Sequence, residues 1–555
     1  MASDTLTNGF EKQIPHQQEK NLPGGGNWVV QKFGGTSVGK FAVQIAQDIV
    51  LAGLKKNRVA IVCSARSTYT KSEGTTNRLL RAAREAEKAS SREYHNIVDT
   101  VREDHVQAAK DTIKTSNILS QYIEVVEAEC DSLVRILESA QHLTEVSKRT
   151  EDKIASKGEK LSCLYMTALL KDRGVDAQYV DLSEIITTPS NNSASLNEEW
   201  YVHLALALGK AVRVCGDAVP VITGYFGNVP GGLLSQIGRG YTDLCAALVA
   251  VGLQASELQV WKEVDGIFTA DPRKVPTARL LSSVTPSEAA ELTFYGSEVI
   301  HPFTMDQVIR ASIPIRIKNV KNPRGAGTVI VPDMADDLAG RKPGLFRGRS
   351  LSSLSSHNGP RRPTAVTIKP SITVLNVHSK KRTRAHGFLM SIFSILDKWN
   401  LSVDLISSSE VHVSMAIHSE KSLLSGRSEE GMKIESEALR GAVTDLSVWG
   451  DVDLVPDMAI VSLVGRQLKS MVGISGKFFG VLGDQGINIE MISQGISDSS
   501  LSSCHIEYGA LLELAADNWD ISAGASEINI SCVIEEAEAY RALNVVHTNL
   551  FTFLE

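Results

Sequence analysis

The 555-residue sequence predicts an α/β protein, in which a three-layer αβα sandwich is followed by two small α+β modules. Apolar, β-branched runs alternate with helical segments as far as residue 331, which is typical of a parallel sheet covered by helices on both faces. A stretch rich in Gly, Ser, Pro and Arg follows, and two strand–helix–strand segments repeat beyond it at a constant spacing. These three observations together define the predicted fold class.

The first expected strand is "WVVQKF" (28–33), followed by a Gly-rich turn and the helix "KFAVQIAQDIVLAG" (40–53). The next apolar run, "RVAIVCSA" (58–65), predicts a buried strand, and this order favours parallel pairing. Residues 78–149 are rich in Ala, Glu, Lys and Leu and predict helices, and "YTDLCAALVAVGL" (241–253) predicts another. Later strands are expected at "AQYVDLSEII" (177–186), "AVPVITGYFG" (218–227), "ELQVWKEVDGIF" (257–268), "PIRIKN" (314–319) and "GTVIV" (327–331).

The tail contains an internal repeat. "IFSILDKWNLSVDLISSS" (392–409) aligns with "FFGVLGDQGINIEMISQG" (478–495) at an offset of 478 − 392 = 86. Each copy predicts a helix that ends at Asn400 or Gly486, followed by a strand, with an apolar strand before it ("SITVLNV" or "AIVSLVG"). Duplication explains the constant offset better than chance similarity between two amphipathic units.

The expected organisation has five parts. They are a disordered segment (1–27), the sandwich domain (28–332), a flexible linker (333–364), a first α+β module (365–455) and a second (456–555), whose last strand could complete the first module. The basic cluster in 333–364 could instead be a regulatory or binding segment.

Composition restricts the function. The chain is 43% hydrophobic and 22% charged, with a net charge of −7, so neither nucleic acid nor an anionic membrane is an expected partner. Residues 1–27 lack the apolar core of a signal peptide, and no run approaches the roughly 18 apolar residues of a membrane span, which predicts a cytoplasmic protein. The seven cysteines form no CxxC pair and predict reduced thiols, and no metal-binding cluster is apparent.

The segment "VVQKFGGTSVGKF" (29–41) nearly matches a phosphate-binding P-loop. That motif requires Ser or Thr after its lysine, and Phe41 has no hydroxyl to hold Mg²⁺. A different arrangement can still bind phosphate: Gly34 and Gly35 allow the backbone to approach closely, the next helix presents its N-terminus, and Lys32 supplies an ammonium. A Gly-rich turn can equally be a simple tight connection.

Three other segments carry candidate chemistry, although each feature alone also has a structural interpretation. Glu159 lies in "IASKGEKLS", where a glutamate can favour a helix N-terminus. Arg239, between glycines, suits bidentate binding of a carboxylate, and Asp243 falls in the first turn of the next helix. In "VWKEVDGIFTADPRKV" a strand runs into an acidic turn.

In this order, "KFGGTSVG", "SKGE", "GRGYTDLCAA", "VDGIFTADPR" and "YGSEVIHPFTM" resemble the aspartate kinases of the amino acid kinase family. The duplicated tail resembles their paired ACT domains, which are ferredoxin-like effector-binding modules. The quoted motifs are most similar to those of the fungal, monofunctional branch. The resemblance implies ATP-dependent phosphorylation of L-aspartate to 4-phospho-L-aspartate, the first step toward threonine, methionine and isoleucine, and toward lysine in some organisms. A kinase for another acidic amino acid or carbamate, and a catalytically dead amino-acid sensor, are the alternatives.

The resemblance also implies residue roles. Lys32, Asp243 and His301 would be catalytic, although His301 could be structural, and Gly34, Gly35 and Ser37 would form a phosphate cradle. Mg²⁺ would be held by ATP oxygens and water. Many bacterial relatives have a lysine where this chain has Glu298, which puts one nucleotide contact in doubt. Substrate would contact Thr76, Glu159, Arg239 and Thr242, and nucleotide would contact Lys262, Glu263, Phe268, Asp271 and Arg273.

The tail is expected to bind an effector amino acid and to pair into a homo-oligomer, a dimer at least. The Asp404 carboxylate could bind the side-chain ammonium of a lysine effector. The resemblance of the motifs to the fungal branch favours L-threonine as the effector instead. A purely structural dimerisation tail is the alternative. The expected effector residues are Ser402, Val403 and Asp404 in the first module, and Asn488, Ile489 and Gln494 in the second.

Overall fold

The structure is a computed structural model. It describes residues 19–21, 26–67, 73–186, 197–294, 300, 302–331, 362–380, 387–409, 411–418, 424–428, 431–466, 468, 471–493 and 528–552. The chain forms two compact units, residues 1–265 with 307–327, and residues 266–306 with 328–555.

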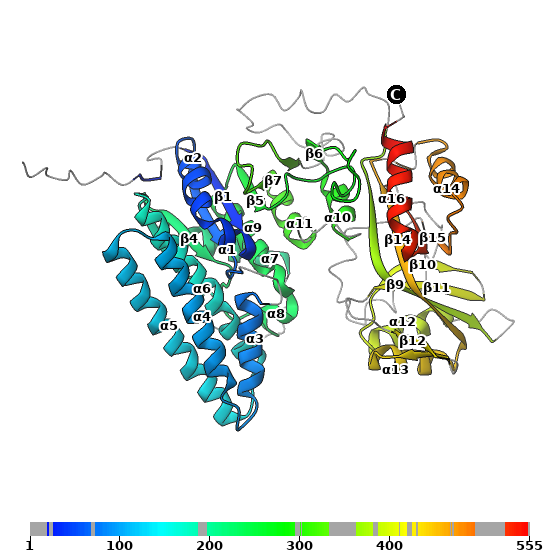
Figure 1. Ribbon diagram of the computed structural model, residues 1–555, viewed down its shortest axis with the longest axis horizontal. Helices are drawn as coiled ribbons and strands as arrows, with labels where there is room; N and C mark the ends of the chain where they lie inside the picture. Colours follow the sequence, from blue (N-terminus) through cyan, green and yellow to red (C-terminus); the bar gives the residue numbers. More distant parts are fainter. Residues whose placement is uncertain are drawn as a thin grey trace, which may run out of the picture. The chain divides into compact units, whose positions relative to one another are not determined.

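The first unit is built on a parallel sheet with the strand order β3-β4-β2-β1-β5-β7 (Figure 1). All its described pairings are parallel, so the carboxyl ends of these strands lie at one edge. The predicted strands are confirmed, although β3, β4 and β5 end earlier than expected. The strands are β1 (Trp28–Phe33), β2 (Arg58–Cys63), β3 (Ala177–Val180), β4 (Val219–Thr223), β5 (Glu257–Lys262) and β7 (Ile315–Asn319).

Helix α1 (Gly35–Gln44) begins five residues before the predicted start at Lys40, because Gly34 already serves as its N-cap. The helix kinks at Phe41, where φ is −127°, and continues as the π-helix η1 (Ile45–Val50) and α2 (Leu51–Leu54). The early start brings the N-terminus of α1 directly to the end of β1.

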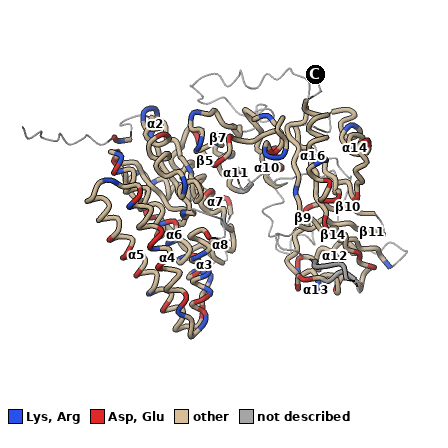
Figure 2. The backbone as a smooth tube through the Cα atoms, viewed as in Figure 1, with Lys and Arg blue, Asp and Glu red and all other residues tan. Residues whose placement is uncertain are grey.

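The helices predicted within 78–149 are present and pack as a bundle with α6 (Figure 1). Acidic and basic side chains are interleaved along these helices (Figure 2), as expected for solvated faces. They are α3 (Thr75–Ala86), α4 (Glu93–Thr112), α5 (Ser116–Leu143) and α6 (Lys148–Asp172), and the unit continues with α7 (Glu198–Arg213), α8 (Leu233–Gln236), the 3₁₀ turn η2 (Gly238–Gly240) and α9 (Tyr241–Leu253).

The side chains of β1 alternate between two helical layers. Phe33 belongs to a core cluster shared with α1 and α6, whereas α9 packs against β1, β2 and β5. Because neighbouring side chains of a strand point to opposite faces, Lys32 faces α9.

Part of the N-terminal segment is ordered. The side chain of Asn21 is fully buried and exchanges two hydrogen bonds with the backbone of Val59, and Glu19 forms a bridge to Val175. The expectation of disorder for 1–27 therefore does not hold for residues 19–21, and most of the remainder lies outside the described residues, as do residues 333–361 of the expected linker.

The second unit contains a six-stranded antiparallel sheet in the order β10-β11-β9-β14-β16-β15. Its strands are β9 (Ala365–Ser379), β10 (Val403–Ser408), β11 (His412–His418), β14 (Gly450–Val464), β15 (Met491–Ser493) and β16 (Asn529–Glu535). The unit also has a short parallel pair, β6 (Ser283–Val284) and β8 (Thr328–Ile330), and a hairpin, β12 (Leu424–Ser428) and β13 (Gly431–Ile434). The helices are α10 (Pro286–Phe294), α12 (Phe388–Lys398), α13 (Glu437–Leu446), α14 (Ile474–Asp484) and α16 (Ala539–His547), with η8 (Thr548–Thr552) after α16. The residues of α11 (Pro302–Arg310) are divided between the two units.

The sequence repeat is a structural repeat. Helices α12 and α14 begin at positions whose difference is 474 − 388 = 86, the offset of the sequence alignment. Each follows a glycine with positive φ and ends before a residue with positive φ, Asn400 (52°) or Gly486 (67°). The last strand, β16, pairs with β14 and β15 of the second module, and the first residues of β9 pack into that module's core, which includes Val366 and Ile368.

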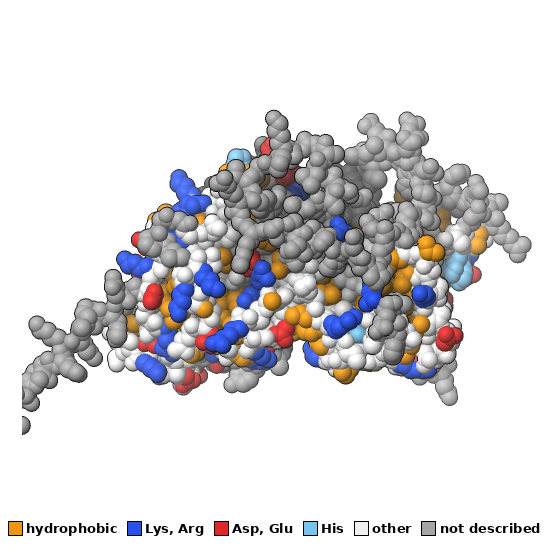
Figure 3. All heavy atoms as spheres, turned by 90° about the horizontal axis from the view of Figure 1, so that it is seen from above, with side chains coloured by type: hydrophobic (Ala, Val, Ile, Leu, Met, Phe, Trp, Pro, Cys, Tyr) orange, Lys and Arg blue, Asp and Glu red, His pale blue; other side chains and the backbone are white. Residues whose placement is uncertain are grey.

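Within the described residues, no helix is long and apolar enough to cross a membrane. On the face shown in Figure 3, the visible Lys and Arg side chains are spread over the described surface and do not gather in one patch.

Candidate active site

Two of the predicted catalytic residues, Lys32 and Asp243, meet at the carboxyl edge of the parallel sheet. Lys32 is the penultimate residue of β1 and pairs in register with Val62 of β2 and Val260 of β5. The turns after β1, β4 and β5 all leave the sheet at this edge, where ligands of open α/β sheets bind.

Lys32 and Asp243 form a largely buried ion pair. The ammonium Nζ lies 2.7 Å from Asp243 Oδ1, and the two side chains are only 11% and 19% exposed. Asp243 occupies the first turn of α9, so the strand supplies the lysine and the helix supplies its partner. The pair holds the ammonium at the sheet edge.

The turn between β1 and α1 brings backbone close to this ammonium. A Cβ on Gly35 would lie 2.1 Å from the carbonyl oxygen of Ala65, so only glycine fits there. At Gly34 a Cβ would meet nothing within 4 Å, which leaves open space beside the N-terminus of α1. Ser37, in the first turn, is buried. The N-terminus of a helix favours anions, so the turn has the character of a phosphate cradle.

Glu159 of α6 is the second charged centre. Its side chain is 2% exposed, accepts a 2.5 Å hydrogen bond from the hydroxyl of Thr242 and accepts another of 2.9 Å from the N–H of Gly224. Burial raises the pKa of Glu159 to about 7, and its hydrogen bonds oppose that rise. Thr242 and Asp243 are consecutive residues in the first turn of α9, so this turn binds Glu159 through one side chain and Lys32 through the next.

The other expected substrate residues lie on neighbouring turns. Thr76 falls in the first turn of α3, after Thr75, whose hydroxyl donates to the carbonyl of Arg66. Arg239 lies in η2, two residues before α9 begins, and the structure describes its backbone but not its side chain.

The expected nucleotide residues fall in both units. Lys262 ends β5 and Glu263 follows it in the first unit. Phe268, Asp271 and Arg273 belong to the second unit, where the Arg273 guanidinium donates to both carboxylate oxygens of Asp271 at 2.8 and 3.0 Å. The two groups therefore belong to different units, and their shared role stays a prediction.

The expected effector residues that are described lie in the tail. Asp404 pairs with Lys369 of β9 at 2.8 Å, and the two side chains are 6% and 14% exposed. Ser402 and Asn488 are exposed, whereas Val403 and Ile489 are partly buried, at the entry to β10 and before β15. His301, Glu298 and Gln494 lie outside the described residues.

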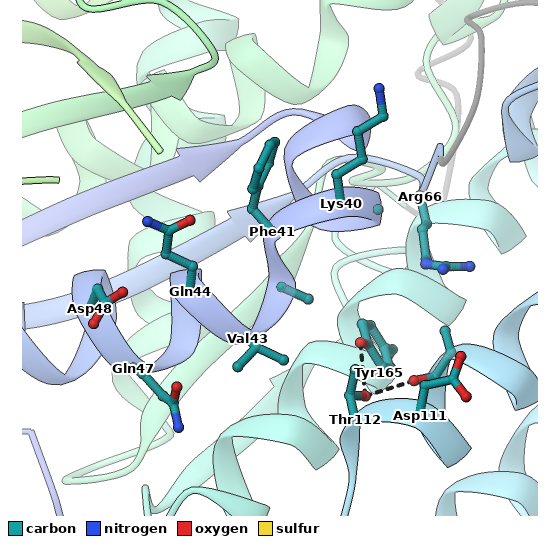
Figure 4. Close-up of a pocket in the computed structure, with 13 residues that line it drawn as sticks. Lys40, Phe41, Val43, Gln44, Gln47, Asp48, Arg66, Asp111, Thr112 and Tyr165 are labelled. Atoms are coloured by element: carbon teal, nitrogen blue, oxygen red, sulfur yellow. Dashed lines mark hydrogen bonds between the residues drawn. The ribbon is translucent and has the colours of Figure 1, made fainter. Parts of the chain in front are cut away.

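In the described part of the chain, no three His, Cys, Asp or Glu residues come together as a possible metal site. A cavity of about 450 Å³ lies beside the middle of α1, away from Lys32 and Glu159, and is lined by Phe41, Arg66, Tyr165 and their neighbours. In Figure 4 the Lys40 ammonium points away from Tyr165 and Thr112, as expected for a solvated helix lysine.

Two contributors to this site were missed in the sequence. Gly224 accepts no side chain, because a Cβ there would lie 2.9 Å from both Glu159 oxygens, and the only signal was its place directly after a strand. Asp152 lies seven residues before Glu159 on α6 and accepts hydrogen bonds from the backbone of Leu233 and Leu234. That spacing places it on the same face of the helix as Glu159, which was a readable signal.

Comparisons with known proteins agree with this architecture. The Amino acid kinase family matches residues 27–319, and an ACT domain matches residues 461–506 and 519–550. The aspartokinase of Schizosaccharomyces pombe is 50% identical over 94% of this chain and 92% of its own length. The aspartokinase of Saccharomyces cerevisiae is also 50% identical, over 95% of this chain and 93% of its own length.

A solved structure shares the whole architecture. The crystal structure of E. coli aspartokinase III in complex with aspartate and ADP matches with a TM-score of 0.64 and 26% identity, over 94% of this chain and 99% of that one. The sequence identity over nearly the full length, the family match across the sheet domain and the ACT match in the tail agree with one another. The chain therefore belongs to the aspartokinases of the amino acid kinase family.

Proposed function

We propose that the site transfers the γ-phosphoryl group of ATP to the side-chain carboxylate of L-aspartate, with Lys32 as the principal charge on the transferring group. The observation that carries this proposal is that the first turn of α9 holds both charged centres: Asp243 pairs with Lys32, and the adjacent Thr242 donates a hydrogen bond to Glu159. The product is 4-phospho-L-aspartate, the first intermediate toward threonine, methionine and isoleucine.

The chemistry suits this residue set. The attacking carboxylate is already ionised at neutral pH, so the reaction needs no general base. Phosphoryl transfer depends mainly on in-line positioning and on neutralisation of charge on the phosphoryl oxygens. Lys32, the backbone at Gly34 and Gly35, and the N-terminus of α1 with Ser37 supply positive potential on one side of the open space beside Gly34.

Two charged residues would hold the amino acid. Glu159 would bind its α-ammonium and Arg239 its α-carboxylate, with Thr76 and Thr242 adding hydrogen bonds. The E. coli relative was crystallised with aspartate, which supports aspartate as the substrate here. Lys262, Glu263, Phe268, Asp271 and Arg273 stay the predicted nucleotide contacts. A catalytic role for His301 stays a prediction.

Mg²⁺ fits this donor set as a companion of the nucleotide. It prefers phosphate oxygens and water to an all-protein cage, and bound there it would neutralise charge on the phosphates. Asp243 would keep Lys32 directed at the transferring group.

The tail would bind L-threonine as a feedback inhibitor, with Ser402, Val403 and Asp404 in one module and Asn488, Ile489 and Gln494 in the other. The Lys369–Asp404 pair supports a neutral effector, because the carboxylate that would attract a lysine side chain already has an ammonium partner. The E. coli relative has been crystallised with lysine, so lysine is the competing effector. ACT modules would also pair into a homo-oligomer, and a cytoplasmic location stays a prediction.

One assay tests the catalytic proposal. The purified protein is incubated with ATP, Mg²⁺ and L-aspartate, L-glutamate or bicarbonate plus ammonia, and the acyl phosphate is trapped with hydroxylamine. Trapped product with L-aspartate alone supports the proposal, and product only with another acceptor would overturn it. Adding threonine or lysine separately then identifies the effector, because an inhibitor must bind the less active state more tightly.

A further inference from the structure

Helix α6 carries two buried carboxylates on one face, two turns apart. Asp152 and Glu159 are 5% and 2% exposed, and both accept hydrogen bonds from the stretch of chain that follows β4. Glu159 binds this stretch at its beginning, Gly224, and near its end, Thr242, and Asp152 binds it in between, at Leu233. The Asp152 and Thr242 attachments are the ones that flank the turn with Arg239.

Both oxygens of Asp152 are used. Oδ2 accepts from the N–H of Leu233 at 2.5 Å and Oδ1 from the N–H of Leu234 at 3.0 Å, which are the first two residues of α8. The preceding Gly232 has a φ of 91°, and a Cβ there would lie 3.1 Å from Lys148 Cβ and 3.3 Å from Asp152 Oδ2. Backbone and carboxylate therefore approach each other as closely as a glycine allows.

We propose that Asp152 is a positioning residue for substrate binding, which holds α8 and the following turn so that the backbone that carries Arg239 is already in place when aspartate arrives. This rests on the proposed role of Arg239 in binding the α-carboxylate. When a ligand has to order a loop, the lost conformational entropy of the loop weakens binding. A loop that is already held in place does not add this cost. Asp152 acts through Arg239 and touches no substrate.

The same helix offers a matched control. Asp172, at the other end of α6, has a side chain that is 1% exposed and accepts from the N–H groups of Lys114 and Thr115 at 3.1 and 2.8 Å, where α5 begins. It performs the same kind of capping without any connection to the Arg239 turn, and it also pairs with Arg173. A loss due only to a broken cap should be similar for both residues.

The experiment compares Asp152→Asn with Asp172→Asn in the full-length protein. Asparagine presents one acceptor oxygen where aspartate presents two, so each variant loses part of its cap. Asp152→Asn should raise the KM for L-aspartate about tenfold or more while the KM for ATP stays within about twofold, as expected when a preorganised charged contact is loosened. Asp172→Asn should lower Tm without changing either KM. Equal KM values for the two variants would overturn the proposal.

A double variant separates this inference from the proposed function. If Asp152 acts through Arg239, then Asp152→Asn added to Arg239→Ala should raise the KM for aspartate no further than Arg239→Ala alone. A normal KM for Arg239→Ala would overturn the substrate role of Arg239 and the inference with it. A raised KM for Arg239→Ala beside a normal KM for Asp152→Asn would overturn the inference alone. If Asp152→Asn does not fold, Gly232→Ala strains the same turn and should raise the same KM.

Discussion

Two lysine–aspartate pairs in this protein have nearly the same geometry and different expected roles. Lys32 and Asp243 are 2.7 Å apart at the sheet edge of the first unit, and Lys369 and Asp404 are 2.8 Å apart in the tail. All four side chains are less than 20% exposed. Pair geometry and burial therefore do not identify a catalytic lysine.

The surroundings make the difference. Beside Lys32 a glycine turn leaves open space and a helix presents its N-terminus, so a phosphate can approach the ammonium. The Lys369 ammonium instead lies 4.6 Å from the centre of the Phe294 ring, which covers it with an aromatic face. An accessible ammonium can bind a ligand, whereas an ammonium covered by an aromatic ring has a structural role.

The largest expected effect comes from breaking the first pair. Lys32→Ala should lower kcat about 10²-fold or more, because a preorganised charge on the transferring phosphoryl group is lost. The matched change Lys369→Ala should leave kcat within about threefold, since this lysine lies outside the proposed active site. Steady-state kinetics with hydroxylamine trapping checks both variants, and a near-normal kcat for Lys32→Ala would remove Lys32 from the mechanism.

The next largest effect is expected when the guanidinium of Arg239, which can donate two parallel hydrogen bonds, is replaced by an ammonium. Arg239→Lys should raise the KM for L-aspartate about tenfold to a hundredfold, because an ammonium cannot reproduce two parallel hydrogen bonds to a carboxylate. Calorimetric titration with aspartate in the absence of ATP measures the affinity directly. Unchanged affinity would contradict the assignment.

The titration of Glu159 predicts a pH effect of about tenfold. Its pKa is raised to about 7, so the ionised form that would bind the substrate ammonium decreases as the pH falls through that value. The KM for aspartate should therefore rise about tenfold between pH 8 and pH 6. In Glu159→Gln this dependence should disappear, and a profile with the same slope in the variant would assign the titration to another group.

The smallest effect on turnover is expected from the tail pair. Asp404→Asn should relieve inhibition by threonine and change uninhibited turnover by less than about twofold, because the effector acts through a shift between states. Asparagine is preferable to alanine here, since alanine would leave the Lys369 ammonium buried without its partner. Activity measured against increasing threonine checks this prediction, and full inhibition of the variant would exclude Asp404 from the effector site.

Local patterns predicted the central strands and α9 well, because apolar β-branched runs and an acidic first turn are local signals. The start of α1 was predicted too late, because consecutive glycines at 34 and 35 are typical of a turn. In the structure Gly34 is the N-cap and Gly35 the first residue of α1, packed against the backbone of Ala65. The pairing of Asp152 with Leu233 joins residues that are 81 positions apart, and no local pattern encodes such a contact. The Lys32–Asp243 pair came from resemblance, not from periodicity.

The two long strands of the tail determine how its two modules unfold. β9 and β14 are 15 residues each and run through both modules, with Val366 in the core of the second and Leu375 in the core of the first. A protein cut between residues 455 and 456 would lose the half of β14 that pairs with residues 365–372 of β9 and expose an unpaired strand edge, which invites aggregation. The duplicated modules should therefore unfold as one cooperative body, and neither should survive excision without the other.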